Sequence, residues 1–366
     1  MKFNLADARI AWITRREIDS GEEHPSNHDW GTDYLFSLGA TRVTTRRVKW
    51  IDRWGEKLRL GPNVSEQIWL FLNQRKYDFI IAKDTDLITI LCGLLWLFRR
   101  RKTMFAFLHF PLRRSIKDFF LVQRCSILLA LSERIRNLSM ITSPEAAERV
   151  STLRWGVDLE FYDRVRGRLG APSDPESKLK VLLIGITGRK FTAVVNALRD
   201  DQEITVRVLT SSPDVLRRIA DLPNFSSVRD DLCTPVSYQQ LVAEYLVCDV
   251  VVVPLDMRPA SDAQLIRQRA TLWGITTLLE ASALGKPVVM TFNPVIDFDV
   301  AGEECGLIMR TDDAESWREA IRWCKTSRTL LPTMGARARR HVEANYGMRD
   351  FQNQLWLVIA NYFNGH

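Results

Sequence analysis

The stretch Gly274-Ile-Thr-Thr-Leu-Leu-Glu-Ala-Ser-Ala-Leu-Gly-Lys-Pro-Val-Val-Met-Thr291 contains the clearest structural signals in the sequence. Gly274 permits a tight turn. Gly285 and Pro287 end the apolar helix-like run that follows it. Val288–Thr291 then has the continuous apolar character of a strand buried on both faces. The segment therefore predicts a loop, a helix and a strand in the order that is typical of an α/β fold.

The start of this helix also suggests a binding site. A glycine-containing loop that opens a helix exposes several N–H groups to an anion such as a diphosphate. One turn further on, the carboxylate of Glu280 could accept hydrogen bonds from ribose hydroxyls. Thr276 or Thr277 could instead cap the helix, and Thr277-Leu-Leu-Glu280 matches a capping box. The local pattern leaves open whether Glu280 binds a ligand or belongs to a helix cap, and it favours the cap.

Strand-like runs alternate with helix-length stretches on both sides of this segment. In the first half the runs are Arg9–Thr14, Phe79–Ala82, Met104–His109 and Met140–Thr142. In the second half they are Val181–Ile186, Thr205–Leu209, Val250–Pro254, Val288–Thr291 and Gly306–Met309. The amphipathic stretches between them include Ser65–Arg75, Ser115–Arg136, Tyr238–Leu246 and Ala314–Lys325. Such alternation indicates parallel sheets that are covered by helices on both faces.

A stretch rich in Gly, Pro, Ser and charge, Arg164–Lys178, reads as a linker between the two halves. We therefore predict two doubly wound, Rossmann-like domains that face each other across a cleft, at residues 1–165 and 179–345. The last helix-like stretch, Asp350–Asn364, is expected to pack back on the first domain. Ligands of such sheets bind beyond the carboxyl ends of the strands.

The charge is unevenly distributed. The chain has a net charge of +7, and residues 1–170 hold 29 basic against 20 acidic side chains. This imbalance suggests an anionic partner for the first half, such as a membrane surface, a lipid phosphate or a charged glycan. Leu94–Lys102, with Arg113, Arg114 and Lys117, could touch anionic lipid or could be a core helix with a basic end.

No apolar run reaches the ~18 residues of a membrane span, and the first residues lack the apolar region of a signal peptide. We therefore expect a cytoplasmic protein, with peripheral association at the inner face of the membrane as an open alternative. The six cysteines form no metal-ligand spacing with each other or with histidine. Asp84-Thr85-Asp86 imitates a metal-binding Asp-x-Asp, but we expect it to cap a helix, and we predict no metal site.

The stretch from Gly274 to Thr291 resembles the nucleotide-sugar-binding segment of group-1, retaining-type glycosyltransferases of the GT-B architecture. The resemblance implies that Glu280 holds the ribose of the donor. It also implies that Gly274, Thr276 and Thr277 hold the diphosphate. In the family a second Glu, eight positions before the first, contacts the donor sugar, but Leu272 stands there in this chain. The identity of the donor sugar is therefore left open.

The stretch Gly185-Ile-Thr-Gly-Arg-Lys190 follows the first predicted strand of the second domain. The resemblance implies that Gly188, Arg189 and Lys190 bind the donor, and that Arg189 and Lys190 act in catalysis by neutralising the leaving diphosphate. Cations at this point suit that role because they stabilise charge that develops on the departing group. The alternative is a solvated basic turn.

Two sites of the first domain are candidates for the acceptor side. His109 ends a predicted strand and would face the cleft, and similar enzymes often carry a catalytic His there, near the donor sugar; the alternative is a structural His beside Pro111. His28 and Asp29 lie in a loop where relatives bind the acceptor. They could act as a general base if the reaction inverts configuration, or the loop could be a polar surface.

The resemblance implies transfer of a sugar from a nucleotide-diphosphate donor to an acceptor hydroxyl on a glycan or glycolipid, in surface polysaccharide or glycoconjugate synthesis, with retention. The donor is a co-substrate, and no other cofactor is expected. The alternatives are a sugar-nucleotide epimerase or hydrolase of similar fold and a catalytically degenerate binding protein, which Leu272 favours. Nucleic acid is not an expected partner, because the basic residues match no nucleic-acid-binding motif.

Overall fold

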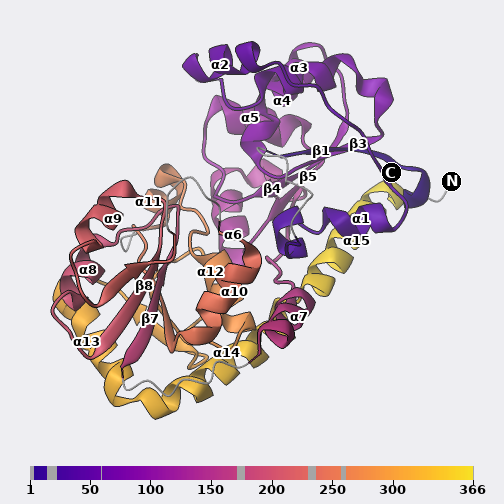
Figure 1. Cartoon of the computed structure of the whole chain (residues 1–366). Helices are drawn as coiled ribbons and strands as arrows, with labels where there is room; N and C mark the ends of the chain where they lie inside the picture. Colours follow the sequence, from indigo (N-terminus) through magenta and orange to yellow (C-terminus); the bar gives the residue numbers. More distant parts are fainter. Residues whose placement is uncertain are drawn as a thin grey trace.

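The computed structural model describes residues 4–14, 23–58, 60–170, 178–229, 236–256 and 261–365. Within these ranges the chain forms two domains, each with a six-stranded parallel sheet that helices flank (Figure 1). The described parts of the sequence therefore alternate strand and helix twice, as the apolar runs predict.

The sheet of the first domain has the order β2-β1-β3-β4-β5-β6. Its strands are β1 (Arg9–Ile13), β2 (Thr41–Arg42), β3 (Phe79–Ala82), β4 (Thr103–Leu108), β5 (Ile127–Ala130) and β6 (Val150–Thr152). Its helices are α1 (Thr32–Ser37), α2 (Lys49–Lys57), α3 (Val64–Leu72), α4 (Thr89–Leu97), α5 (Ile116–Arg124), α6 (Glu133–Thr142) and α7 (Leu159–Leu169). Short 3-10 turns are η1 (Leu5–Asp7), η2 (Ser26–Asp29), η3 (Gln74–Lys76), η4 (Thr85–Leu87) and η5 (Pro144–Ala146).

The sheet of the second domain has the order β12-β11-β10-β7-β8-β9. Its strands are β7 (Leu179–Ile184), β8 (Ile204–Leu209), β9 (Phe225–Ser227), β10 (Val250–Val253), β11 (Val288–Thr291) and β12 (Gly306–Met309). The helices are α8 (Thr192–Leu198), α9 (Pro213–Ile219), α10 (Tyr238–Val247), α11 (Asp262–Gln268), α12 (Ile275–Ala283), α13 (Ala314–Thr326), η6 (Arg328–Leu330), α14 (Leu331–Asn345) and α15 (Met348–Asn364).

The central strands of the second sheet bury both faces, which explains their unbroken apolar sequences. Successive side chains of a strand point to opposite faces. Leu182 and Val251 belong to the core that α10 and α12 cover, and this core continues into the first domain. Leu183 and Val252 pack instead in the core beneath α8 and α13. The face with α12 is thus the one turned toward the first domain.

The last helix, α15, runs from the second domain along the first (Figure 1). Its start is tied down by a hydrogen bond of 3.0 Å from the Met348 N–H to the Val157 carbonyl. Phe351 stacks on Phe107 of β4 at 6.1 Å between ring centroids. Phe363, near the other end of the helix, packs against Phe79 of β3 at 5.4 Å. Aromatic packing therefore holds this helix on the first sheet.

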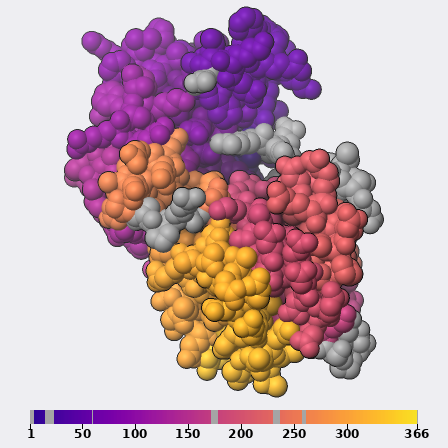
Figure 2. Space-filling model, turned by 90° about the vertical axis from the view of Figure 1, so that its left-hand side faces the viewer, coloured from indigo at the N-terminus to yellow at the C-terminus, as the bar shows by residue number. Residues whose placement is uncertain are grey.

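The segment around α11 and the loop after β11 reaches up against the first domain, as the orange atoms of Figure 2 show. Asp297 of that loop accepts a hydrogen bond of 2.7 Å from the Glu133 N–H, at the start of α6. Burial raises the pKa of Asp297. The guanidinium of Arg269 lies 3.5 Å from the Phe110 ring centroid and 3.5 Å from the Asp86 carboxylate. These contacts join the domains beside the cleft.

Two predicted elements of the first domain are wrong. Met140–Thr142, predicted as a strand, is the last part of helix α6. Ser115–Arg136, predicted as one helix, contains β5 between α5 and α6. The reason lies at Ser132, whose side chain caps α6 by accepting from the Ile135 N–H, so a new helix starts there. Short apolar runs do not distinguish a buried strand from a buried helix.

The predicted linker is shorter than expected. Helix α7 continues to Leu169, so the first part of Arg164–Lys178 is helical. Residues 171–177, the rest of that stretch before Lys178, lie outside the described residues.

The Asp84 side chain accepts from the Asp86 N–H at 3.1 Å at the start of η4, which confirms the expected cap.

Candidate functional site

A pocket of about 480 Å³ opens at the carboxyl ends of β7 and β8, where their loops meet the start of α12. Its lining contains the predicted donor-binding residues Arg189, Gly274, Thr276, Thr277 and Glu280. Among the lining residues in the described ranges, His28 alone comes from the first domain. The pocket therefore lies at the strand edge where ligands of doubly wound sheets bind, on the side facing the cleft.

Helix α12 starts differently from the prediction. It begins at Ile275, and Gly274 is its N-cap with φ of 93°, a left-handed conformation that favours glycine. Thr276 and Thr277 lie inside the first turn, and no side chain caps the helix. The predicted threonine cap and the capping box with Glu280 are both wrong. The Ile275 N–H donates to the Leu272 carbonyl at 3.1 Å, whereas the N–H groups of Thr276 and Thr277 have no intrahelical acceptor and border the pocket.

Among the described residues, Glu280 supplies the carboxylate of the pocket lining, and its side chain is 6% exposed. Its Oε1 lies 3.3 Å from His28 Nε2, and its Oε2 accepts a hydrogen bond of 3.3 Å from the Tyr245 hydroxyl. Burial and then the charge of Glu280 raise the pKa of both Tyr245 and Tyr162 well above the usual range. Both phenols are therefore neutral, and that of Tyr245 keeps a proton to donate to the carboxylate.

Arg189 folds back from the loop after β7 into the same pocket. Its guanidinium donates to the carbonyls of Ile184 and Thr187 at 3.2 and 2.9 Å and to the Thr277 hydroxyl at 3.2 Å. Burial lowers its pKa to about 10, so it stays protonated at neutral pH. No carboxylate of the described residues forms an ion pair with it. A partly buried cation without a counter-charge favours an anionic ligand.

Glycines make room for this arrangement. A Cβ on Gly185 would lie 1.9 Å from Arg189 Nε, and one on Gly188 would lie 2.2 Å from the Trp273 ring. Gly188 also has φ of 65°. The predicted partner Lys190 is placed elsewhere: its ammonium pairs with Asp312 at 2.5 Å, and it is not part of the pocket lining.

The two predicted acceptor residues are separated. His28 contacts Glu280 and packs on the Tyr238 ring with centroids 4.9 Å apart, so it closes the pocket from the first domain. Asp29 is turned away from the pocket and lies 2.7 Å from His24 Nε2. The structure therefore brings His28, and not Asp29, to the predicted donor residues.

His109 lies just beyond β4, but it does not line the pocket. Its Nε2 is 2.8 Å from the Lys83 carbonyl, which identifies that nitrogen as the N–H donor. Its ring packs against Trp30 at 4.7 Å and Trp155 at 6.3 Å. These contacts match the structural alternative for His109, which would then support the wall of the cleft.

Solved structures with a similar arrangement of both domains identify the architecture of the chain. No protein-family model and no curated protein matches the sequence. Among solved structures, sucrose-phosphate synthase from Thermosynechococcus elongatus superposes with a TM-score of 0.71 at 15% identity, over 98% of this chain and 100% of that one. Anabaena HepE in complex with UDP and glucose gives a TM-score of 0.66 at 14% identity, over 97% and 100%.

The chain has the GT-B fold. This result confirms the predicted fold class. Proteins with a different assigned chemistry also match this chain. A Listeria monocytogenes protein described as a putative UDP-N-acetylglucosamine 2-epimerase superposes with a TM-score of 0.56 at 9% identity, over 98% of both chains. Fold alone therefore leaves the activity to the site.

Several pocket residues of this GT-B chain are not evident in the sequence. Tyr238, Tyr245 and Arg229 line or support the pocket, and the Arg229 Nε is buried without a hydrogen-bond acceptor. Each lies in or beside an ordinary helix or strand, and no motif marks it. Leu272 lines the pocket as a buried apolar side chain, where the family pattern has a carboxylate.

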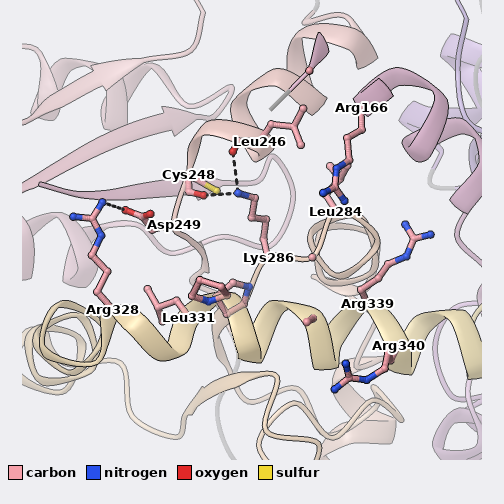
Figure 3. Close-up of a pocket in the computed structure, with 15 residues that line it drawn as sticks. Arg166, Leu246, Cys248, Asp249, Leu284, Lys286, Arg328, Leu331, Arg339 and Arg340 are labelled. Carbon is pink, nitrogen blue, oxygen red and sulfur yellow. Dashed lines mark hydrogen bonds and ion pairs between the residues drawn. The ribbon is translucent and has the colours of Figure 1, made fainter. Parts of the chain in front are cut away.

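A larger cavity of about 670 Å³ lies at the other end of the second sheet, between α7, α14 and the loop before β11 (Figure 3). Its cations are largely engaged. Lys286 donates to the carbonyls of Leu246 and Cys248 at 2.9 and 2.8 Å, and Arg328 pairs with Asp249 at 2.9 Å. These bonds tie the connection between α10 and β10 to the loop before β11 and to η6, so we interpret the cavity as part of the packing between elements.

Neither a metal centre nor a membrane-spanning helix is found among the described residues. No group of three His, Cys, Asp or Glu side chains there is arranged to hold a metal ion. None of the helices within the same ranges combines the length and apolar character that a bilayer crossing requires. The pocket at α12 is thus the best-supported site of this GT-B chain.

Proposed function

We propose that the protein is a glycosyltransferase that moves a sugar from a nucleotide-diphosphate donor to an acceptor hydroxyl. The observation that carries this proposal is that one pocket holds both Arg189, a cation that no carboxylate of the described residues pairs with, and the buried carboxylate of Glu280. A diphosphate supplies the missing negative charge, and a ribose supplies hydroxyls for the carboxylate.

The donor fits the pocket in one direction. The diphosphate lies at the first turn of α12, where free N–H groups, the Thr276 and Thr277 side chains and Arg189 can bind its oxygens. The ribose hydroxyls donate to Glu280, in place of His28 or Tyr245. The aromatic rings of Tyr238 and Trp273 in the lining supply flat apolar surface for the base.

In the proposed reaction the bond between the anomeric carbon and the β-phosphate oxygen breaks as the acceptor oxygen bonds to that carbon. Negative charge grows on the departing diphosphate, and Arg189 stabilises it. With retention, the leaving diphosphate itself takes the proton of the acceptor hydroxyl. His28 reaches the pocket from the first domain beside Glu280 and Tyr238, at the ribose and base of the proposed donor.

The named relatives support a uridine donor as the first to test. HepE was solved with UDP, with UDP-glucose, and with UDP and glucose. The second candidate is a sugar-nucleotide epimerase or hydrolase, which the match to the Listeria monocytogenes protein supports. Leu272 in place of a sugar-binding carboxylate also supports a binding protein without turnover.

Turnover assays separate these functions. The purified protein is incubated with UDP-glucose, UDP-N-acetylglucosamine or GDP-mannose, with and without a panel of glycan and glycolipid acceptors, and nucleotide release and sugar products are measured. A glycosyltransferase releases nucleotide much faster with its acceptor and forms a new glycoside. Donor consumption at the same rate without any acceptor contradicts the proposal and identifies a hydrolase or epimerase.

A further inference from the structure

Helix α2 of the first domain carries two adjacent exposed stripes. Trp50, Trp54 and Leu58 follow each other at four-residue spacing, at the end of which Leu58 is the C-cap, and their exposed fractions are 65%, 60% and 63%. Residues four apart lie on one side of a helix. Lys49, Arg53 and Lys57, one position before each of them, are exposed as well. The helix thus presents two tryptophans and a leucine beside a row of three cations.

The outward direction of these stripes is fixed by the opposite side of the helix. Gly55 is buried, and a Cβ there would lie 2.1 Å from the Val64 side chain at the start of α3. The Asp52 carboxylate accepts a hydrogen bond of 2.8 Å from the Ser65 N–H. Since this side already binds α3, the tryptophans face away from the protein.

Large exposed apolar side chains continue onto the neighbouring helices α3, α4 and α5, which pack in this order beside α2. They are Ile68, Leu72, Trp96, Leu97, Phe98, Ile116 and Phe119. Near the top of Figure 1, α2, α3, α4 and α5 form one group. Exposed apolar side chains that gather on neighbouring helices mark a site of association.

Cations accompany these apolar side chains. Arg99, Arg100 and Arg101 follow α4 directly and are exposed. On α2 itself Glu56 is the exposed acid, since Asp52 binds α3. Tryptophan with lysine and arginine is the combination that prefers the interface of a bilayer, where rings lie among the headgroups and cations contact phosphates.

The surface lies next to the cleft. The Asn63 amide, at the start of α3, donates to the Thr14 carbonyl at 3.2 Å. Thr14 directly follows β1, so this contact is at the carboxyl edge of the first sheet, where the cleft begins. A membrane at α2 would therefore lie beside the entrance for the acceptor.

We propose that α2 docks the protein on an anionic lipid bilayer, with Trp50, Trp54 and Leu58 in the headgroup region and Lys49, Arg53 and Lys57 on lipid phosphates. On this proposal the helix lies in the plane of the membrane and does not cross it. The docking itself is independent of catalysis. Its consequence, that the acceptor is a lipid-linked molecule presented at the membrane, rests on the proposed glycosyltransferase function.

Vesicle co-sedimentation tests the docking. The full chain is mixed with phosphatidylcholine vesicles with or without about a third phosphatidylglycerol, and bound protein is measured. We expect binding to the anionic vesicles, a loss of about tenfold or more in the double variant Trp50→Ser with Trp54→Ser, and about fivefold per charge for Lys49→Gln, Arg53→Gln and Lys57→Gln. The tryptophan fluorescence of the unmodified protein should shift to the blue on binding, and the variant without Trp50 and Trp54 should lose that shift.

Matched substitutions on the second domain serve as controls. Trp323→Ser replaces a tryptophan that is also exposed, and Arg199→Gln, Arg217→Gln and Arg218→Gln remove three exposed cations. Both controls should bind vesicles as the unmodified protein does. All variants should keep their melting temperature and their stabilisation by the nucleotide sugar, so a failure of docking is distinguishable from a failure of the proposed function.

Two results overturn the docking proposal. One is equal binding to neutral and anionic vesicles, or no binding to either. The other is a lower molecular mass in solution for the α2 tryptophan variant without any change in vesicle binding, because α2 would then be a contact between two copies of the chain.

Discussion

The charged side chains of the site in the second domain are partly or fully buried, whereas the charged side chains of α2 in the first domain are exposed. The Glu280 side chain is 6% exposed, and the Arg189 guanidinium donates hydrogen bonds to two carbonyls and a hydroxyl. Both groups can therefore contact only a ligand that is small enough to enter the pocket. Lys49, Arg53 and Lys57 are in solvent beside two exposed tryptophans. The contrast suggests that one domain recognises a small molecule and the other a broad surface.

The largest effect should come from Arg189→Met in the second domain. Removing a cation that stabilises developing charge is expected to lower kcat by roughly 10²–10³-fold. Lys190→Met is the matched control: because Lys190 pairs with Asp312 outside the pocket, we expect less than about a fivefold change. Steady-state kinetics with the preferred donor measure both. Equal losses for the two variants would contradict the assignment of the anion site to Arg189.

Glu280→Gln should weaken donor binding by about 10–100-fold, because charge-assisted hydrogen bonds to the ribose are lost. The melting temperature should change little, since the amide oxygen can still accept from the Tyr245 hydroxyl. Calorimetric titration and thermal denaturation measure the two properties. Glu315→Gln, at an exposed ion pair of the same domain, is the control and should leave donor affinity unchanged. A loss of stability with unchanged donor affinity would make Glu280 a structural residue only.

Gly188→Ala tests the close approach of Trp273 to the loop after β7. The added methyl meets the indole ring at 2.2 Å, and φ of 65° is strained for alanine, so donor affinity should fall by about tenfold and the protein should lose about 1–2 kcal/mol of stability. Gly167→Ala on α7 is the control, since a Cβ there meets nothing within 4 Å. A Gly188→Ala protein with normal donor affinity would mean that Trp273 has no part in the pocket.

His28→Ala should have the smallest effect on the donor. The contact with Glu280 is long, at 3.3 Å, and comes from the other domain, so we expect less than about a fivefold change in donor affinity. The KM for the acceptor should stay unchanged, because His28 lies against Glu280 and Tyr238, at the ribose and base of the proposed donor. Initial rates at varied donor and acceptor concentrations separate the two. A rise in the acceptor KM alone would place His28 at the acceptor instead.

Much of the scaffold could be predicted from apolar runs and turn residues. Phe79–Ala82, Val288–Thr291 and Gly306–Met309 are strands at the predicted bounds. Gly274, Arg189 and Glu280 meet because each belongs to a loop or helix at the same edge of a parallel sheet, and that edge is predictable. Their resemblance to a known motif supplied the expected roles, which stay predictions.

The remaining features depend on packing between distant segments. The contact of His28 with Glu280 joins residues on different domains, and its existence depends on how those domains are oriented. Tyr245 reaches Glu280 from another helix, and its helical pattern resembles that of any buried aromatic residue. Lys190 lies next to Arg189 in the sequence but pairs with Asp312, because neighbouring side chains of an extended loop point in different directions. Contacts of this kind can be identified only from the three-dimensional structure, because the sequence around each residue does not show which distant residue it meets.

On the proposed function, the pocket at α12 binds a nucleotide-diphosphate sugar. Thermal denaturation of the unmodified protein with UDP-, GDP-, ADP- and TDP-linked sugars measures this binding. A ligand that binds only the folded state at about 100 times its Kd stabilises it by about 2.7 kcal/mol, so one of these donors should raise the melting temperature clearly. An unchanged melting temperature with all four at millimolar concentration would contradict the account.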